Sequence, residues 1–302
     1  IKAQTVSLTK QDLTLHTTQP LSIKAVNGLY QIQNFSLNSS KGKVEIIGRD
    51  IKADALNLQI NADSDLKLAQ LFVPLFEEIS GAIRIRSSIS GPWNKPQLIG
   101  SMKIDNGYFR IKNFPHPFEK VSVDTTFSQS RILFNDIHGV LGGGDLTGDG
   151  SLQIQGPQNI PMIFHIKART ISLNIPDQVH TKGDADLTFS GSWFPFTIAG
   201  TYRIASTKFE MNFSGEKLGA DVKQNYYLPP TVKEKVADPL SLDLQLVFEK
   251  PIVIKNNLLD AQATGQIAIK GNPSLPILSG KLESLKGSKL LFKDKPFDIQ
   301  SA

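Results

Sequence analysis

Five histidines are the side chains best suited to metal binding or proton transfer near neutral pH. They are His16, His116, His138, His165 and His180, and none forms an HExxH motif or another paired spacing typical of zinc sites. The sequence has no cysteine, which excludes disulfides, thiolate metal ligands and cysteine nucleophiles. It also lacks a Gly-x-Ser-x-Gly elbow, so a serine hydrolase is not indicated. We expect no catalytic residues, no metal and no cofactor.

A glycine-rich run, GVLGGGDLTGDG at 139–150, could bind either phosphate or calcium. A phosphate-binding loop needs Gly-Lys-Ser/Thr at its end, but Gly150 is followed by Ser151 and Leu152. A calcium repeat needs the GGxGxDxUx motif in tandem, and here Asp145 and Asp149 are misplaced in a motif that occurs once. A tight or bulged turn is therefore favoured.

Composition indicates a folded chain. Hydrophobic residues make up 40% and charged residues 20%, which is close to the average for globular proteins. No apolar run approaches the roughly 18 residues of a membrane-spanning helix. The net charge of +5 is spread without a block of Lys or Arg, so we expect no nucleic-acid partner. The chain begins without Met or a signal peptide, and we expect it to be a fragment.

Most of the sequence alternates apolar and polar residues with a period of two, which is typical of half-buried β-strands. In the segment 240–248, Leu and Phe side chains occupy one face, while Ser241, Asp243 and Gln245 occupy the other. The pattern predicts an all-β fold with one apolar face.

Two segments break this alternation. Between Asp65 and Ile79 the apolar residues have helical spacing, which predicts a short helix that lies against the apolar face of the sheet or plugs one end of it. Pro74 should kink this helix or start a second short one. Between 214 and 239 strand alternation is lost and Lys, Glu and Pro are concentrated, which predicts a flexible loop or linker.

A glycine and proline pattern occurs twice at the same offsets. Its two copies are Gly91, Pro96, Gly100 and Gly107, and Gly271, Pro276, Gly280 and Gly287. A weaker third copy starts at Gly191 and keeps Gly200. The pattern predicts a strand, a turn between the first glycine and the proline, a second strand crossed by a central glycine, and another turn. Glycine inside a strand marks a bend or bulge, so the sheet should curl at each copy.

The segment SDLKLAQLFVPLFEEISGAIRIRSSISGPWNKPQLIGSMKIDNGYFRI resembles the repeating unit of the TamB family, which is AsmA-like and related to bridge-like lipid transfer proteins. The stretch from Pro239 to Ile299 resembles the start of the TamB C-terminal domain, cut before its end. The resemblance implies a repetitive β-trough over 1–213, the linker over 214–239 and this domain over 240–302. It implies an elongated, curled β-sheet, or open trough, with a hydrophobic lumen and one short helix.

The resemblance also implies a location and partners. The location is the periplasm of a diderm bacterium, with an inner-membrane anchor outside this chain. The expected partners are phospholipid acyl chains and a TamA-like outer-membrane protein of the BamA family. The implied role is non-enzymatic transport of phospholipid between the two membranes.

Inward-facing apolar positions are the only functional residues that the resemblance transfers. The expected groove lining comprises Ile83, Ile85, Leu98, Met102, Ile104, Phe109, Ile111, Leu152, Ile154, Phe164, Ile166, Phe189, Ile198, Tyr202, Ile204, Phe209, Leu242, Leu244, Leu246, Ile267, Ile269, Leu278 and Leu282. The alternative is a scaffold for outer-membrane protein assembly, in which a sheet edge pairs with a strand of its client. A structural β-solenoid is a third alternative, but the variable strand lengths argue against it.

Overall fold

The computed structural model describes residues 2–299 apart from 4–6, 11, 12, 18, 41, 53, 72–75, 112, 113, 157, 158, 175–178, 193, 194, 210–239, 274, 293 and 294. These residues form 21 β-strands and one short 3-10 helix, which confirms the expected all-β class and the curled sheet. In this part of the chain, no helix is long and apolar enough to cross a membrane. The chain divides into two compact units, residues 1–166 with 190–193 (unit 1) and residues 167–189 with 194–302 (unit 2).

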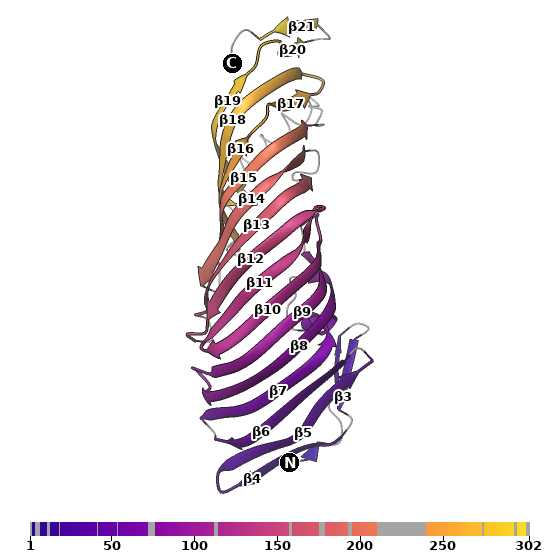
Figure 1. Cartoon of the computed structure of the whole chain (residues 1–302), viewed down its shortest axis with the longest axis vertical. Coiled ribbons are helices and arrows are strands. Elements are labelled where there is room, and N and C mark those ends of the chain that lie inside the picture. The colour runs from indigo at the N-terminus through magenta and orange to yellow at the C-terminus, as the bar shows by residue number, and fades with distance from the viewer. Residues whose placement is uncertain are drawn as a thin grey trace, which may run out of the picture. The chain divides into compact units, whose positions relative to one another are not determined.

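Unit 1 is an antiparallel sheet in which each strand from β4 to β12 pairs with the next one along the chain (Figure 1). At the N-terminal end, β5 pairs with β4 along one part of its length and with β3 along another. The strands are β1 (Lys2–Ala3), β2 (Ser7–Lys10), β3 (Leu13–Thr17), β4 (Leu21–Val26), β5 (Leu29–Ser39), β6 (Gly42–Ile51), β7 (Ala55–Asp65), β8 (Phe76–Pro92), β9 (Gln97–Ile111), β10 (Phe118–Gln129), β11 (Arg131–Leu141), β12 (Gly144–Gln153) and the first part of β13 (Pro161–Asn174).

Tight turns join neighbouring strands because the sequence supplies residues that tolerate positive φ. Asn27 and Gly28 connect β4 to β5 with φ of 51° and 74°, and Gly142 and Gly143 connect β11 to β12 with φ of 54° and 76°. Positive φ at both central residues is the geometry of a type I′ hairpin turn. The glycine-rich run at 139–150 therefore forms a hairpin, and the turn predicted there is confirmed.

The central glycine of the repeat is a point of close backbone approach. Gly100 in β9, Gly200 in β15 (Phe196–Phe209) and Gly280 in β19 (Leu275–Ser284) have φ of 146°, 136° and 155°. A β-carbon at any of them would lie closer than 3.0 Å to a carbonyl oxygen of the neighbouring strand. Only glycine lets these strands bend and still pair closely.

At the remaining repeat positions, the two copies agree at the first glycine and differ at the later positions. Gly91 and Gly271 both have positive φ, of 87° and 84°, at the ends of their strands. The Lys95 amide then donates to the Pro92 carbonyl at 3.0 Å, which closes the turn before Pro96. In the second copy, Pro276 lies near the start of β19 and Gly287 has φ of 91° after it.

The turn predicted at Gly107 is wrong. Gly107 lies inside β9 and pairs with Val121, where the register between β9 and β10 shifts on both sides. A β-carbon there would lie 2.7 Å from the Phe109 ring. The glycine therefore accommodates a β-bulge rather than a turn.

The predicted helix is present but shorter than expected. It is a 3-10 helix, η1 (Leu66–Leu71), capped by the Asp65 carboxylate, which accepts the Lys67 amide at 2.8 Å. Phe76–Ile79 begins β8 instead of continuing the helix, because these residues pair with β9. The predicted kink at Pro74 lies outside the described residues. Leu68 packs against Leu37 on the apolar face of the sheet, as expected.

Unit 2 contains a parallel step. β15 pairs in parallel with β16 over nine residues, and β17 extends this pairing. A parallel pair needs a crossover of a dozen or more residues. The predicted linker at 214–239 lies between these strands and outside the described residues. Besides β15, β19 and the rest of β13, the strands are β14 (Val179–Ser192), β16 (Leu240–Phe248), β17 (Ile252–Lys255), β18 (Leu259–Asn272), β20 (Lys289–Phe292) and β21 (Lys295–Asp298).

Replacing Gly100 by alanine should lower the free energy of unfolding by about 2–4 kcal/mol, because the added methyl group collides with β8 and strains the backbone. Gly156→Ala is the control, since a β-carbon there meets nothing within 4 Å. Urea unfolding followed by circular dichroism measures both variants. Equal losses of stability would show that the close approach at Gly100 does not constrain the sheet.

A candidate apolar groove on the inner face of the sheet

The pairing register aligns apolar side chains of successive strands on one face of unit 1, which we call the inner face. Paired residues in a sheet point to the same side. Three rows cross the strands in this way, and polar side chains interrupt them at few positions. They are Leu37, Val44, Ala62, Ile85, Met102, Thr125 and Phe134; Phe35, Ile46, Ile60, Ser87, Gly100, Phe127, Ile132 and Leu152; and Ser64, Ile83, Ile104, Val123, Ile137 and Gly148.

The opposite, outer face carries the charges. Arg84 pairs with Lys103 across β8 and β9, and both side chains contact the Asp105 carboxylate. Lys103 also lies 3.4 Å from Asp124 on β10. These ion pairs are exposed, so each contributes little to stability. Because the charges lie on the outer face and the apolar side chains on the inner face, the sheet is amphipathic.

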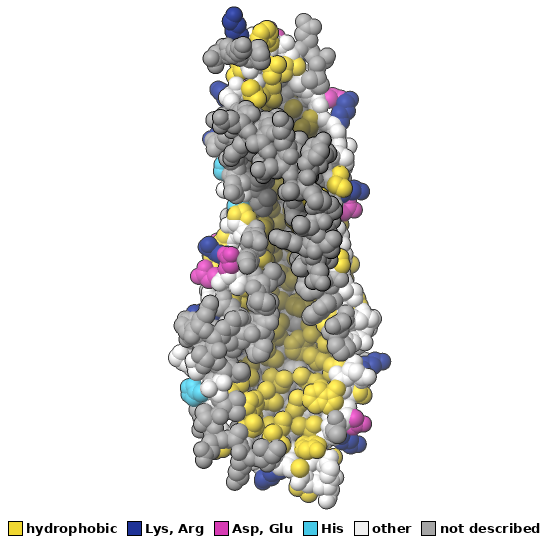
Figure 2. Space-filling view, turned by 180° about the vertical axis from the view of Figure 1, so that it is seen from behind, with side chains coloured by type: hydrophobic (Ala, Val, Ile, Leu, Met, Phe, Trp, Pro, Cys, Tyr) yellow, Lys and Arg dark blue, Asp and Glu magenta, His cyan; other side chains and the backbone are white. Residues whose placement is uncertain are grey.

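On β8 and β9, the predicted lining residues Ile83, Ile85, Leu98, Met102 and Ile104 are only half-buried. On the flanking strands, Ala62, Val123 and Phe127 of the same face are buried. In a closed and packed β-core, such side chains would be buried on all sides. Figure 2 shows the hydrophobic side chains gathered in a hollow over the strands of unit 1. The inner face is therefore an apolar groove that is open over β8 and β9.

The other predicted lining residues of unit 1 are half-buried near the ends of this face or on β13. Phe109 pairs with Phe118 and Ile111 pairs with Phe76. Leu152 on β12 is the last residue of the second row. Ile154 lies just after β12, and its amide donates to the Ser130 carbonyl at 2.7 Å. Phe164 and Ile166 lie on β13, and the Phe164 ring is 5.0 Å from that of Phe134.

Two glycines of β12 make room for side chains of β13, a role that the sequence analysis missed. A β-carbon on Gly150 would collide with the Phe164 ring, and one on Gly148 would lie 2.7 Å from the Ile166 Cδ1 atom. Both glycines belong to the inner face, since they pair with Phe134 and Ile137. The alternation of Leu146, Gly148, Gly150 and Leu152 is the signal that could have placed them there.

In unit 2, the predicted lining residues of neighbouring strands also share one face. The register aligns Ile198 with Leu242, Tyr202 with Leu246 and Ile267, and Leu244 with Ile269 and Leu278. Ile204 is nearly fully buried, whereas Leu278 is 63% exposed and Leu282 is also exposed. Among the described strands, β19 pairs with β18 alone. The Phe189 ring lies 5.0 Å from that of Phe196. The backbone of Phe209 pairs with that of Ile254, but the Phe209 side chain is outside the described part of the structure.

A pair of uncharged hydroxyl groups lies next to this face in unit 2. The Tyr202 hydroxyl lies 3.0 Å from the Thr181 hydroxyl, which donates in turn to the Leu173 carbonyl at 3.2 Å. Burial raises the pKa of Tyr202 above its ordinary value, so the phenol stays neutral. The network satisfies these polar atoms and leaves the face without a charge at this point.

The candidate chemical groups of the sequence do not converge. The described residues contain no group of three or more His, Asp and Glu side chains that could hold a metal ion. His138 contacts Asp136 at 2.7 Å and His165 contacts Asp149 at 3.5 Å, and all four side chains are exposed. The arrangement that the structure does assemble is the apolar groove, which can cover apolar ligands.

Comparison with family models found a match to the TamB C-terminal domain over residues 135–302. Comparisons with curated proteins and with solved structures found no match. The family match begins in β11, upstream of the boundary predicted at 240, and the domain boundaries from the sequence stay predictions. TamB proteins are proteins of the bacterial envelope. Because the match covers more than half of the chain, the chain belongs to the TamB family.

Proposed function

We propose that this chain is a non-enzymatic lipid conduit that covers phospholipid acyl chains in its inner-face groove. The observation that carries the proposal is the register that aligns apolar side chains from β5 to β12, of which those on β8 and β9 are only half-buried. Such a surface gives an acyl chain apolar contact at each successive strand.

The energetic benefit of covering an acyl chain is large. Each buried methylene contributes about 0.8 kcal/mol, so two chains in water would cost on the order of 20 kcal/mol or more. An apolar groove removes most of this cost without any chemical step. We place the conduit in the periplasm, with an inner-membrane anchor and a TamA-like partner in the outer membrane, where it would move phospholipid between the membranes.

The exposed edge of unit 2 favours a second function, the assembly of outer-membrane proteins. β19 pairs with β18 on one side, and no described strand pairs with its other side. Leu275 and Ile277 on this strand are 79% and 66% exposed. An open edge with apolar side chains is a template for an added strand.

Replacing Met102 on the inner face by arginine should slow acyl-chain passage by about two orders of magnitude, since a charge facing apolar chains costs roughly 2–4 kcal/mol. The adjacent variant, Ser101→Arg, adds the same charge to the exposed outer face and should leave lipid transfer unchanged. Transfer of a fluorescent phospholipid between vesicles is the readout, with circular dichroism as the folding control. Full activity of Met102→Arg, or an equal loss with Ser101→Arg, would refute the conduit.

Replacing Ile277 by lysine on β19 tests the second function. A lysine on an edge strand opposes strand addition, so binding to a purified TamA-like barrel should weaken about tenfold or more if the edge is the docking site. Ile163→Lys changes an exposed apolar residue on β13 and should have no effect. Unchanged binding by Ile277→Lys would exclude the β19 edge as the docking site.

A further inference from the structure

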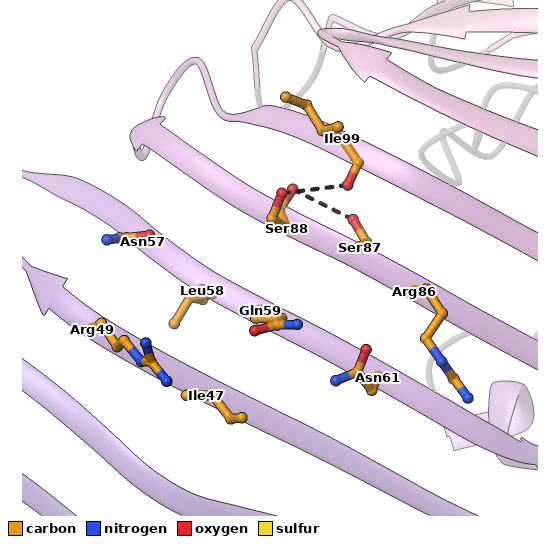
Figure 3. Close-up of a pocket in the computed structure, with 10 residues that line it drawn as sticks. All are labelled: Ile47, Arg49, Asn57, Leu58, Gln59, Asn61, Arg86, Ser87, Ser88 and Ile99. Atoms are coloured by element: carbon orange, nitrogen blue, oxygen red, sulfur yellow. Dashed lines mark hydrogen bonds between the residues drawn. The ribbon is translucent and has the colours of Figure 1, made fainter.

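A polar depression lies on unit 1, and most of its lining residues belong to the outer face. It has a volume of about 390 Å³, within the range of small-ligand sites, and it is formed by β6, β7, β8 and β9 (Figure 3). Its lining comprises Ile47, Arg49, Asn57, Leu58, Gln59, Asn61, Arg86, Ser87, Ser88 and Ile99.

Three carboxamides form a ladder along the middle of this depression. Asn57, Gln59 and Asn61 follow one another at every second position of β7, so they point to the same side. Two residues of a strand advance by roughly 6.8 Å, so the ladder extends over about 14 Å. None of the three has a side-chain hydrogen bond to any residue that the structure describes. Each carboxamide therefore keeps both its acceptor oxygen and its donor nitrogen for a ligand.

The two arginines of the depression differ in their partners. Arg86 forms an ion pair with Asp63 and donates to the Ala62 carbonyl at 2.9 Å. Arg49 is exposed and has no carboxylate or carbonyl partner within the described part of the chain. On the same strand as Arg49, Lys43 contacts Glu45, and Arg84 of β8 contacts Asp105 of β9. Arg49 is thus an uncommitted cation among the lining residues of the depression.

Two aliphatic side chains flank the carboxamides. Ile47 of β6 pairs with Gln59 of β7. On the other side of Gln59, Ser88 of β8 lies between Gln59 and Ile99 of β9. Ile99 is 60% exposed, although it lies on the polar face of the sheet. A ligand for this depression should therefore offer hydroxyl or amide groups to the ladder, small apolar groups to the isoleucines and a single anion to Arg49.

We infer that this depression binds an N-acetylated glycan that carries carboxylate groups. Its hydroxyls and acetamido N–H and C=O groups match the carboxamides, its acetyl methyl groups match Ile47 and Ile99, and its carboxylate matches Arg49. A heavily phosphorylated saccharide would need more free cations than Arg49 supplies. A phospholipid would need an apolar trench beside the charge, and the apolar rows of unit 1 lie on the inner face. In a bacterial envelope, the glycan of this chemistry is the cell wall.

Co-sedimentation of the 302-residue chain with purified peptidoglycan sacculi tests the inference. Wild type should pellet with sacculi, and a soluble disaccharide of N-acetylglucosamine and N-acetylmuramic acid should release it. Arg49→Gln should weaken binding about tenfold, because a hydrogen bond to a charged group is lost. The double variant Asn57→Ala, Asn61→Ala should weaken it at least as much.

Matched controls lie on the same unit but outside the depression. Arg131→Gln removes an exposed arginine of β11, and Gln33→Ala removes an exposed carboxamide of β5, and both should bind like wild type. The inference is overturned if wild type does not pellet, if the disaccharide fails to release it, or if the depression variants bind as tightly as the controls. Binding to lipopolysaccharide or phospholipid vesicles that the depression variants abolish, without binding to sacculi, would also overturn it.

Discussion

The two-residue period of the β-strand, kept in register from one strand to the next, is the constraint on which this structure depends. A shift of one residue at any strand would move its apolar side chains to the solvent face and bring its charges into the groove. In unit 1 the register is held by antiparallel neighbours joined in chain order, with tight hairpins such as Asn27-Gly28. The apolar rows of the inner face and the ion pairs of the outer face are two results of this single alignment.

Glycines allow the aligned sheet to curve. At Gly100, Gly200 and Gly280 the neighbouring backbone approaches so closely that any side chain would collide. On β12, Gly148 and Gly150 lack side chains and leave space for Ile166 and Phe164 from the next strand. Curvature and groove shape therefore both depend on missing β-carbons.

Several features of the fold followed from local sequence patterns. Period-two alternation predicted the strands, and the glycine and proline repeat located the close approaches at Gly100 and Gly280, because each signal lies within one strand or one turn. The parallel pairing of β15 with β16 could not be predicted in this way, because it joins segments separated by residues 210–239. The helix at Leu66–Leu71 was overextended because Phe76 and Ile79 satisfy both a helical and a strand pattern, and pairing with β9 decides between them. The depression around Asn57 was missed because its side chains come from four strands.

The central claim is that acyl chains lie along the inner face, and a phospholipid with a photoreactive acyl chain tests it most directly. After illumination with the 302-residue chain, mass spectrometry of the peptides would locate each adduct. The account predicts adducts at alternate residues of β8 and β9, on inner-face positions such as Ile83, Ile85, Met102 and Ile104, with few on Arg84 or Lys103. Adducts spread equally over both faces, or confined to the edge strand β19, would contradict it.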